Sequence, residues 1–445
     1  RVVRPLKVAA VCAALLGLVG TAMVGATQYQ AELFRPRLGG IPTALRTMPR
    51  FLGKDYRHDL EARLEQRYQL VRDQFPLPKL DGSVDIFPWN TTIVVAHGLD
   101  YRPRPAFQSY TAYTPELLDL NRNFMTSTQA PDYIVFDVAP IDGRFPSLDD
   151  SVLWPILLTH YELYTNTDHA IILKKARLPL DYSFLQNAQA EAEINQWVFL
   201  PDSVTDLTWT RITIEKTFFG RLLSTLFQPP LITMSVRFDD DTESEYRIVP
   251  GIARSGFLLS PFINSRADFA TLFLDGGTLL AQNKDMRVKA VRINAGRMDR
   301  LAYRQVVQFV FSDLLVPSLK DRVHEADTSA WWWQEMGLEY YHRGHLGMAL
   351  TSLNRSMQAD DSNTDVIVQA MLLQALLGQW SDVQRLSAKA LRLEKDNWSA
   401  IFFGQLASQV LQSSGRTFFY EPEGIKAVAD GLLRNTHRHH SESAE

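Results

Sequence analysis

Four short apolar runs in the first half of the chain are bounded by glycine, proline or polar residues. They are residues 84–87, 92–96, 133–137 and 170–174. Runs of this length with such boundaries predict buried β-strands. Between two of them, Thr114 can cap a helix that begins at Pro115 and ends near Met125. Strands separated by helices predict a small parallel α/β domain over residues 81–180.

From Trp197 onward the pattern changes to an alternation of apolar and polar side chains. Three segments show this two-residue period: residues 207–216, 231–238 and 286–293. The polar segment DDDTES, residues 239–244, suits the turn of a hairpin and lacks the ligand alternation and the glycine of a calcium loop. Strands joined by short polar turns, with no helix between them, predict a β-sandwich over residues 195–316.

The chain becomes helical in pattern after residue 328, and Gly344 and Gly378 lie 34 residues apart. Around these glycines, large, small and aromatic side chains recur at set positions. They are Trp333, Gly337, Tyr340, Gly344, Ala349 and, in a looser second copy, Gly378. Residues 332–398 therefore resemble the tetratricopeptide repeat family.

The resemblance implies helical repeats over residues 328–435 with a concave surface that can hold a partner protein. We expect Gly344 and Gly378 to lie where neighbouring helices approach too closely for a side chain. Residues 436–445, with three histidines among polar residues, are expected to be a disordered tail.

The beginning of the chain carries a membrane signal. Residues 8–27 contain no charged side chain over 20 positions, which is long enough for a helix to cross a bilayer. We therefore expect a transmembrane anchor over residues 1–30 rather than a cleaved signal peptide, whose apolar run is shorter. Arg1, Arg4 and Lys7 precede the run and place its start in the cytoplasm, with the bulk of the chain outside. An amphipathic pattern at residues 56–73 predicts a helical stalk over residues 31–80.

Composition narrows the classes of partner. Apolar residues make up 46% of the chain and charged residues 22%, the balance of folded domains exposed to water. The net charge is -4 with both signs interspersed, so nucleic acid is not an expected partner. Cys12 is the only cysteine, which excludes an intramolecular disulfide and a thiolate-bound structural zinc. The sequence indicates no bound metal or cofactor.

Polar and aromatic side chains follow the ends of two expected strands, where an open parallel sheet has its ligand crevice. The candidate ligand-binding residues are His97, Asp100, Tyr101, Arg102, Arg104, Asp137, Asp142 and Arg144. Arginine can bind a carboxylate or phosphate, tyrosine can stack on a sugar ring, and histidine can transfer a proton.

The alternative interpretation is structural, and it is favoured because no phosphate loop, nucleophile elbow or metal triad accompanies these residues. In this view Arg102 and Arg104 pair with Asp100, Asp137 or Asp142 and tie loops together. No catalytic residue can be assigned from the sequence.

A second resemblance covers more of the chain. After the anchor come WNTTIVVAHGLDYRPRPAFQSYTAYTPELLDLN, APDYIVF, PIDGRFPSLDDSVLWP and SGFLLSPFI. This order resembles the extracytoplasmic C-terminal half of multi-spanning bacterial envelope proteins of unassigned function. It implies a location in the bacterial inner membrane, with the bulk of the chain extracytoplasmic.

Two functions stay open. One is a binding and scaffolding protein whose repeats hold a partner protein and whose β-domain holds a partner or a glycan. The other is the soluble C-terminal half of a membrane glycosyltransferase or polysaccharide-assembly protein.

Overall fold

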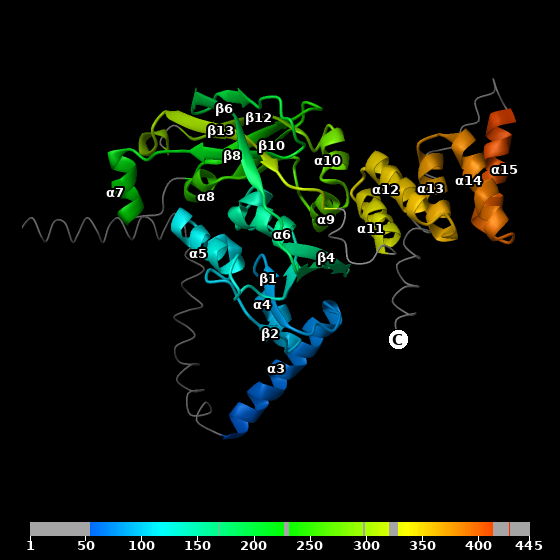
Figure 1. Ribbon diagram of the computed structural model, residues 1–445, viewed down its shortest axis with the longest axis horizontal. Coiled ribbons are helices and arrows are strands. Elements are labelled where there is room, and N and C mark those ends of the chain that lie inside the picture. Colours follow the sequence, from blue (N-terminus) through cyan, green and yellow to red (C-terminus); the bar gives the residue numbers. More distant parts are fainter. Residues whose placement is uncertain are drawn as a thin grey trace, which may run out of the picture. The chain divides into compact units, whose positions relative to one another are not determined.

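The structure, a computed structural model, describes residues 54–412, apart from 168, 227–230, 297–298 and 320–327, together with residue 427 (Figure 1). The chain divides into two compact units between Gln74 and Phe75. The described part of the first unit is helix α3 (Lys54–Gln74), which confirms a helix over residues 56–73. The expected anchor and the histidine-containing tail lie outside the described residues. Within those residues, no helix combines the length and the apolar character that crossing a membrane requires.

The first sheet of the second unit is mixed rather than parallel. Its five strands, in spatial order, are β2 (Asp100–Tyr101), β1 (Ser83–Phe87), β3 (Tyr133–Phe136), β5 (Ile171–Lys175) and β4 (Tyr161–Asn166). Strand β1 runs parallel to β2 and β3, whereas β5 runs antiparallel to both β3 and β4. The link between β4 and β5 is too short for the crossover that a parallel pair needs, so these two strands form a hairpin.

Local sequence signals located most of this sheet correctly. Strands β1, β3 and β5 coincide with three of the four apolar runs. Helix α5 (Pro115–Met125) begins at the expected cap, where the Thr114 hydroxyl accepts a hydrogen bond from the Leu117 amide at 3.4 Å. Helix α6 (Trp154–His160) follows two single 3₁₀ turns and leads directly into β4.

The prediction of a strand at residues 92–96 is wrong. Residues Thr91–Ala96 form the short helix α4, which buries Ile93, Val94 and Ala96 and exposes Val95. The β-branched residues of this run favour a strand, but burial against the tertiary structure overrides such a local preference. Strand β2, which follows the helix, takes the place beside β1 instead.

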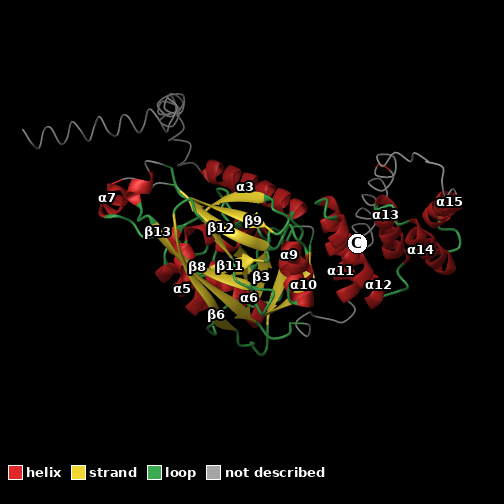
Figure 2. Ribbon diagram, turned by 90° about the horizontal axis from the view of Figure 1, so that it is seen from above, coloured by secondary structure: helices red, strands yellow, loops and turns green. Residues whose placement is uncertain are grey.

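Two antiparallel sheets occupy the segment predicted as a β-sandwich (Figure 2). One sheet contains β10 (Glu243–Arg247), β9 (Thr233–Phe238), β12 (Val288–Asn294) and β7 (Trp197–Phe199). The other contains β11 (Phe257–Ser260), β8 (Thr208–Thr213), β13 (Val306–Leu315) and β6 (Ser183–Glu193). The turn between β9 and β10 confirms the predicted hairpin. Strand β6 lies before the predicted boundary at residue 195. Most of its side chains are exposed or only partly buried, so an apolar pattern does not indicate it.

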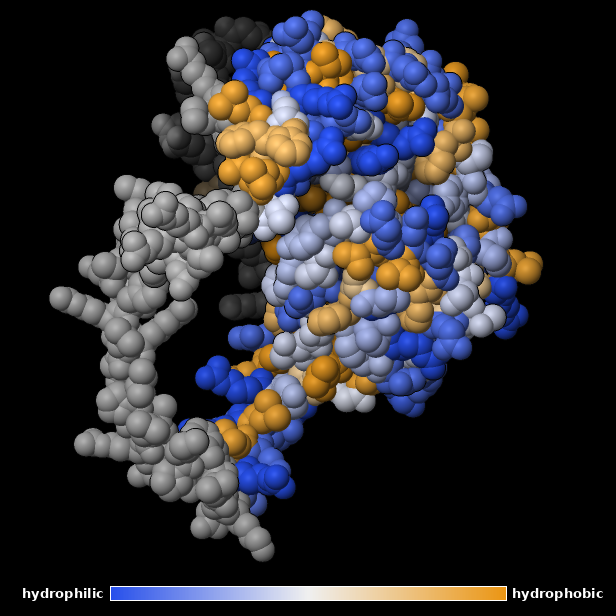
Figure 3. Space-filling view, turned by 90° about the vertical axis from the view of Figure 1, so that its left-hand side faces the viewer, coloured by the Kyte–Doolittle hydropathy of each residue, from blue (hydrophilic) through white to orange (hydrophobic). Residues whose placement is uncertain are grey.

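The expectation of strands without intervening helices is also wrong. Four helices lie between the strands: α7 (Phe218–Leu226), α8 (Pro250–Ser255), α9 (Arg266–Asp275) and α10 (Thr278–Gln282). Helix α9 is almost entirely buried and belongs to the hydrophobic core that the sheets share. Helix α7 lies at one end of this unit, the end that faces the viewer in Figure 3.

Five helices complete the described chain. They are α11 (Thr328–His342), α12 (Leu346–Ala359), α13 (Thr364–Leu376), α14 (Trp380–Leu393) and α15 (Trp398–Gln412). Each contacts the next along the chain, and α11 also contacts α9. Arg343 binds the buried Asp268 at 2.8 Å, and the hydroxyls of Tyr340 and Thr271 lie 3.1 Å apart. The helical C-terminal region is therefore fixed to the sheets through α9.

The two glycines that define the 34-residue spacing do not pack between helices as expected. Both are exposed, with φ of +84° at Gly344 and +71° at Gly378, and a Cβ at either would meet nothing within 4 Å. Each lies just beyond a helix end, in the left-handed conformation that glycine adopts without strain. The close approach occurs instead at Gly337, where a Cβ would lie 2.8 Å from the side chain of Leu353. The other proposed packing residues, Trp333, Tyr340 and Ala349, are buried.

Candidate functional site

Arg104, from the predicted ligand-binding loop, is fully buried in a network of its own chain. Its Nε binds Asp150 at 2.8 Å and its Nη1 binds Asp85 at 2.8 Å. The remaining N–H groups donate to the carbonyl oxygens of Ile86 and Pro88 and to the hydroxyl of Ser109. All five donors of the guanidinium are thus used, and none is left for a ligand.

The charges in this network compensate one another. Burial raises the pKa of Asp85, although Arg104 opposes the effect. Burial alone would lower the pKa of Arg104, but the carboxylates of Asp85 and Asp150 raise it above its ordinary value. Arg104 thus ties segments of its own chain together through Asp85 and Asp150, and not through the predicted Asp100, Asp137 or Asp142.

Arg144 is buried in a second network. Its Nη1 donates to Asp149 at 3.2 Å and to the carbonyl oxygen of Tyr110 at 3.1 Å. Burial raises the pKa of Asp149 to about 6, an effect that Arg144 opposes and that the nearby charge of Asp150 increases. The Oδ2 atom of Asp149 is buried without a hydrogen-bond partner among the described residues, which leaves the ionised form poorly stabilised.

The other predicted residues are dispersed. Arg102 and Asp100 are exposed and 3.9 Å apart, a weak surface pair. His97 contacts the carbonyl oxygen of Phe75 through Nε2 at 2.8 Å. The hydroxyl of Tyr101 is buried without a described partner, and burial raises its pKa to about 12. The eight candidates therefore do not form one crevice.

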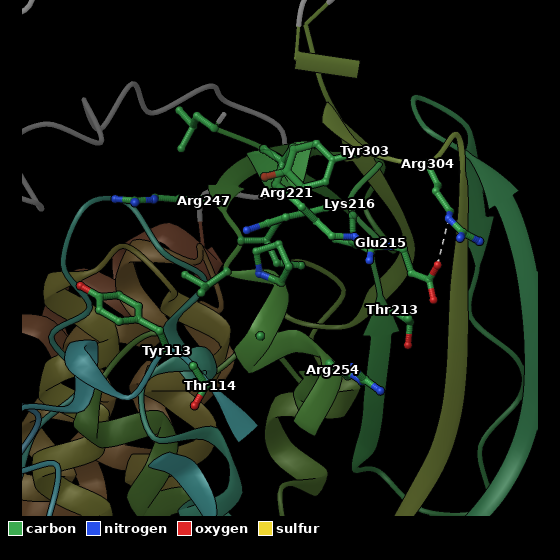
Figure 4. Close-up of a pocket in the computed structure, with 17 residues that line it drawn as sticks. Tyr113, Thr114, Thr213, Glu215, Lys216, Arg221, Arg247, Arg254, Tyr303 and Arg304 are labelled. Atoms are coloured by element: carbon green, nitrogen blue, oxygen red, sulfur yellow. Dashed lines mark ion pairs between the residues drawn. The ribbon is translucent and has the colours of Figure 1, made fainter. Parts of the chain in front are cut away.

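A different cavity, which we call the cationic groove, has a volume of about 860 Å³ (Figure 4). One wall is the segment Tyr113–Thr114 that precedes α5, and the others come from the ends of β8 and β10, from α7 and α8, and from the segment before β13. Its lining carries five cationic side chains, those of Lys216, Arg221, Arg247, Arg254 and Arg304. Figure 4 shows Lys216 and Arg221 near Tyr303, with Tyr113 and Thr114 on the other side.

The groove has an excess of positive charge. Glu215 is the only acidic residue among the described residues of its lining, and it pairs with Arg304 at 3.0 Å. Arg247 pairs with Asp142 at 2.9 Å, which is where the structure places that predicted residue. Among the residues described, none lies within 4.0 Å as an ion-pair partner of Lys216, Arg221 or Arg254, although the charge of Arg254 helps to lower the pKa of Glu116. This local excess contrasts with the net charge of -4 of the whole chain.

The buried arginine networks hold one wall of the groove in place. Arg104 binds Ser109, and Arg144 binds the backbone of Tyr110 and lies 5.6 Å from the ring of Tyr113. Gly251 of α8 packs against the same segment, since a Cβ there would lie 2.1 Å from the carbonyl oxygen of Tyr113. Arg104 and Arg144 therefore position one wall of the groove.

Sequence reasoning missed the groove's five cationic residues. They come from separate segments between residues 216 and 304, so no local motif contains them. The only available signal was the position of Lys216 at the end of the predicted strand over residues 207–216, and such a position is common among surface residues. Tertiary structure alone brings these side chains together.

A smaller cavity of about 220 Å³ lies where β1 and β3 end. Trp89 and Asn90 follow β1, Asp137 follows β3, and His169 precedes β5. Burial raises the pKa of Asp137, whose Oδ1 accepts a hydrogen bond from the Val138 amide at 2.8 Å. This is the location expected for a crevice in a parallel sheet, and Asp137 alone of the eight predicted site residues lines it.

The acidic triplet in the β9–β10 turn forms separate interactions. Asp239 pairs with Arg287, Asp241 pairs with Lys289, and Asp240 accepts hydrogen bonds from Thr242. In the part of the chain that the structure describes, no group of three or more histidine, cysteine or acidic residues is placed to hold a metal ion.

Comparison with known proteins gives no family for this chain. No protein-family model matches it, and no curated protein matches it at a significant level. The function is therefore inferred from the chemistry of the two cavities and from the arrangement of the helices.

Proposed function

We propose that this chain is a membrane-anchored, extracytoplasmic binding and scaffolding protein of the bacterial envelope. In this proposal the cationic groove binds an anionic ligand and helices α11–α15 hold a partner protein. The observation that carries it is the groove itself, where two of the five cationic side chains are paired with carboxylates and three have no ion pair among the described residues. A cavity with this charge balance attracts phosphate and carboxylate groups.

The side chains of the groove favour a glycan that bears phosphate or carboxylate groups. Guanidinium groups bind both kinds of anion through paired hydrogen bonds. Tyr113 is 48% exposed and offers a flat apolar face at the same cavity, which suits a sugar ring. The groove is local and the chain as a whole is acidic, so the proposal does not include nucleic acid.

The helical region supports the scaffolding part of the proposal. A glycine with positive φ lies two residues beyond the end of α11 and of α13, and each of these helices contacts the helix that follows it. The residue after each glycine donates its backbone amide to a carbonyl oxygen of the preceding helix. His345 donates to Tyr340, and Gln379 donates to Gln374. Equal turns in successive helix pairs agree with tetratricopeptide-like repeats, whose surfaces hold peptides and helices.

Isothermal titration of the full chain with inorganic pyrophosphate and glucose 1-phosphate tests the groove, with glucose as the uncharged comparison. Both anions should bind, added salt should weaken them, and glucose alone should bind less well. Lys216→Ala and Arg221→Ala should each reduce the affinity about tenfold, as the loss of a charge-assisted hydrogen bond does. Arg385→Ala, which removes an exposed arginine of α14, is the matched control and should change nothing. Wild-type protein that binds neither anion would disprove this use of the groove.

The alternative function is the soluble half of a membrane glycosyltransferase or polysaccharide-assembly protein. The observation that favours it is Asp137, a largely buried carboxyl with a raised pKa at the ends of two parallel strands. A carboxyl with a raised pKa holds its proton to higher pH than an ordinary aspartate, which suits a general acid or base. Release of sugar from a short-chain prenyl phosphate sugar, followed by mass spectrometry, tests it. Turnover that is lost in Asp137→Asn would support the enzyme, and its absence in the wild type would count against it.

A further inference from the structure

Helix α7 presents an unusually apolar face to solvent. Phe218 is 83% exposed, Phe219 is 49% exposed and Leu222 is 51% exposed. The helix contains no acidic residue, and its one charged residue is Arg221. Figure 3 views the molecule from the end that carries α7, and apolar surface lies beside polar surface there. Exposed aromatic and aliphatic side chains in such a group indicate a binding surface.

The opposite face of α7 is held firmly. A Cβ on Gly220 would lie 1.9 Å from the carbonyl oxygen of Ala302, so the helix backbone is in direct contact with that segment. The Thr217 hydroxyl donates to the carbonyl oxygen of Leu301 at 2.7 Å, and the Thr217 amide donates to Ala302 at 3.0 Å. Leu301 is itself half exposed beside the helix. We call Phe218, Phe219, Leu222 and Leu301 the apolar patch.

The apolar patch adjoins the cationic groove. Arg221 belongs to α7 and lines the groove, and Lys216 lies in the segment that leads into the helix. Leu231, which is exposed, also lines the groove. Apolar and cationic side chains next to each other, without acidic residues in the helix, are typical of helices that lie in the interface of an anionic bilayer.

We infer that α7 and the adjoining cations form one surface that binds an anionic phospholipid bilayer. Phe218, Phe219 and Leu222 enter the acyl boundary, and Lys216 and Arg221 bind headgroup phosphates. Charge complementarity selects this occupant, because an uncharged apolar partner would leave both cations unused. The inference rests on the proposed function, since it assigns part of the same anion-binding groove to lipid phosphate.

The test uses the full chain reconstituted into vesicles, so that any anchoring by residues 8–27 is common to all samples. In a Cys12→Ser background, an environment-sensitive NBD fluorophore is attached at Thr225→Cys, an exposed position of α7. The same label at Lys395→Cys, exposed before α15, is the control. Phosphatidylcholine vesicles are compared with vesicles that also contain phosphatidylglycerol, each with brominated lipid as a contact quencher.

With phosphatidylglycerol present, the label at residue 225 should shift to the blue and be quenched, while the label at residue 395 should not respond. Phe218→Ser with Phe219→Ser, or Leu222→Ser alone, should abolish the quenching; these side chains are exposed, so the core is unaffected. Lys216→Ala with Arg221→Ala should remove the dependence on phosphatidylglycerol. Equal quenching in both lipids, or quenching that persists in the serine variants, would overturn the inference. A blue shift without quenching would assign the patch to a second copy or another protein and would also overturn it.

Pyrophosphate titration separates this inference from the proposed function. The serine variants should bind pyrophosphate as the wild type does, because the apolar patch does not contact the soluble anion. If the wild type binds pyrophosphate but shows no lipid quenching, the bilayer surface alone is rejected. Intact lipid quenching without pyrophosphate binding by the wild type would reject the soluble anionic ligand and leave the bilayer surface standing.

Discussion

Gly251 lies so close to the carbonyl oxygen of Tyr113 that a Cβ at residue 251 would be 2.1 Å from that oxygen. Any side chain there must separate α8 from the segment before α5, and both line the cationic groove. Gly251→Ala should therefore lower the free energy of unfolding by about 1 to 3 kcal/mol, as overpacking does. It should also weaken pyrophosphate binding, because one wall of the groove moves. Chemical denaturation and isothermal titration measure the two effects.

Gly347→Ala is the matched control for this substitution. Gly347 lies in the first turn of α12, without positive φ, and a Cβ there would meet nothing within 4 Å. Alanine favours a helix over glycine, so this variant should be unchanged or more stable by up to about 1 kcal/mol. If Gly251→Ala behaved like Gly347→Ala, the contact between α8 and Tyr113 would not be rigid.

The two arginines of the predicted ligand loop should respond differently to substitution. Arg104→Met leaves Asp85 and Asp150 as buried carboxylates without their counter-charge, which typically costs about 3 to 5 kcal/mol. Arg102→Ala removes only an exposed pair 3.9 Å long and should cost less than about 1 kcal/mol. Urea denaturation of both variants measures the difference, and equal losses would contradict the buried network.

The contrast shows which features the sequence could predict. The cap of α5 was predictable because Thr114, Pro115 and the amide of Leu117 lie within four residues of one another. The partners of Arg104 lie 19 and 46 positions away, at Asp85 and Asp150, and no local pattern relates them. The sequence did identify this loop as a group of polar and aromatic side chains at the end of an expected strand. It could not distinguish a guanidinium that faces a ligand from one whose five donors are all used internally.

The candidate site was less predictable than the fold, and for a related reason. Asp137 was identified because strand ends in a parallel sheet have a known relation to a crevice. Lys216, Arg221 and Arg304 gather only because helices and an antiparallel strand bring distant segments together. The exposed face of α7 was also missed, because it interrupts a region in which the alternation of side chains predicts strands alone.

Asp149 should give the stability of the protein a distinct pH dependence. Its pKa is about 6 in the folded chain against an ordinary 3.8, so the folded protein binds more protons than the unfolded chain between these pH values. The raised pKa therefore increases the free energy of unfolding at low pH, and this stabilisation is lost as pH rises from 3.8 to about 6. A shift of this size corresponds to about 2 to 3 kcal/mol.

Asp149→Asn removes the titrating group and keeps an oxygen that can accept from Arg144. Relative to wild type, the variant should become more stable as pH rises from 4 to 7, by on the order of 2 kcal/mol. Thermal unfolding of both proteins in the same buffers measures the difference at each pH. Parallel curves would show that Asp149 is ionised throughout and that its buried Oδ2 has a partner.

The helical region offers a test of why glycine occurs where it does. Gly337 packs α11 onto α12, since a Cβ would lie 2.8 Å from Leu353, whereas Gly344 needs only a positive φ. Gly337→Leu should therefore separate the helices, at a cost of about 1 to 3 kcal/mol, and expose α11–α15 to proteolysis. Gly344→Asn should be nearly neutral because asparagine tolerates the left-handed conformation, while Gly344→Val should cost about 1 to 2 kcal/mol. Limited proteolysis with mass spectrometry of the fragments distinguishes the three variants. If Gly344→Asn destabilised this region as much as Gly337→Leu, the glycine of the 34-residue spacing would have a packing role after all.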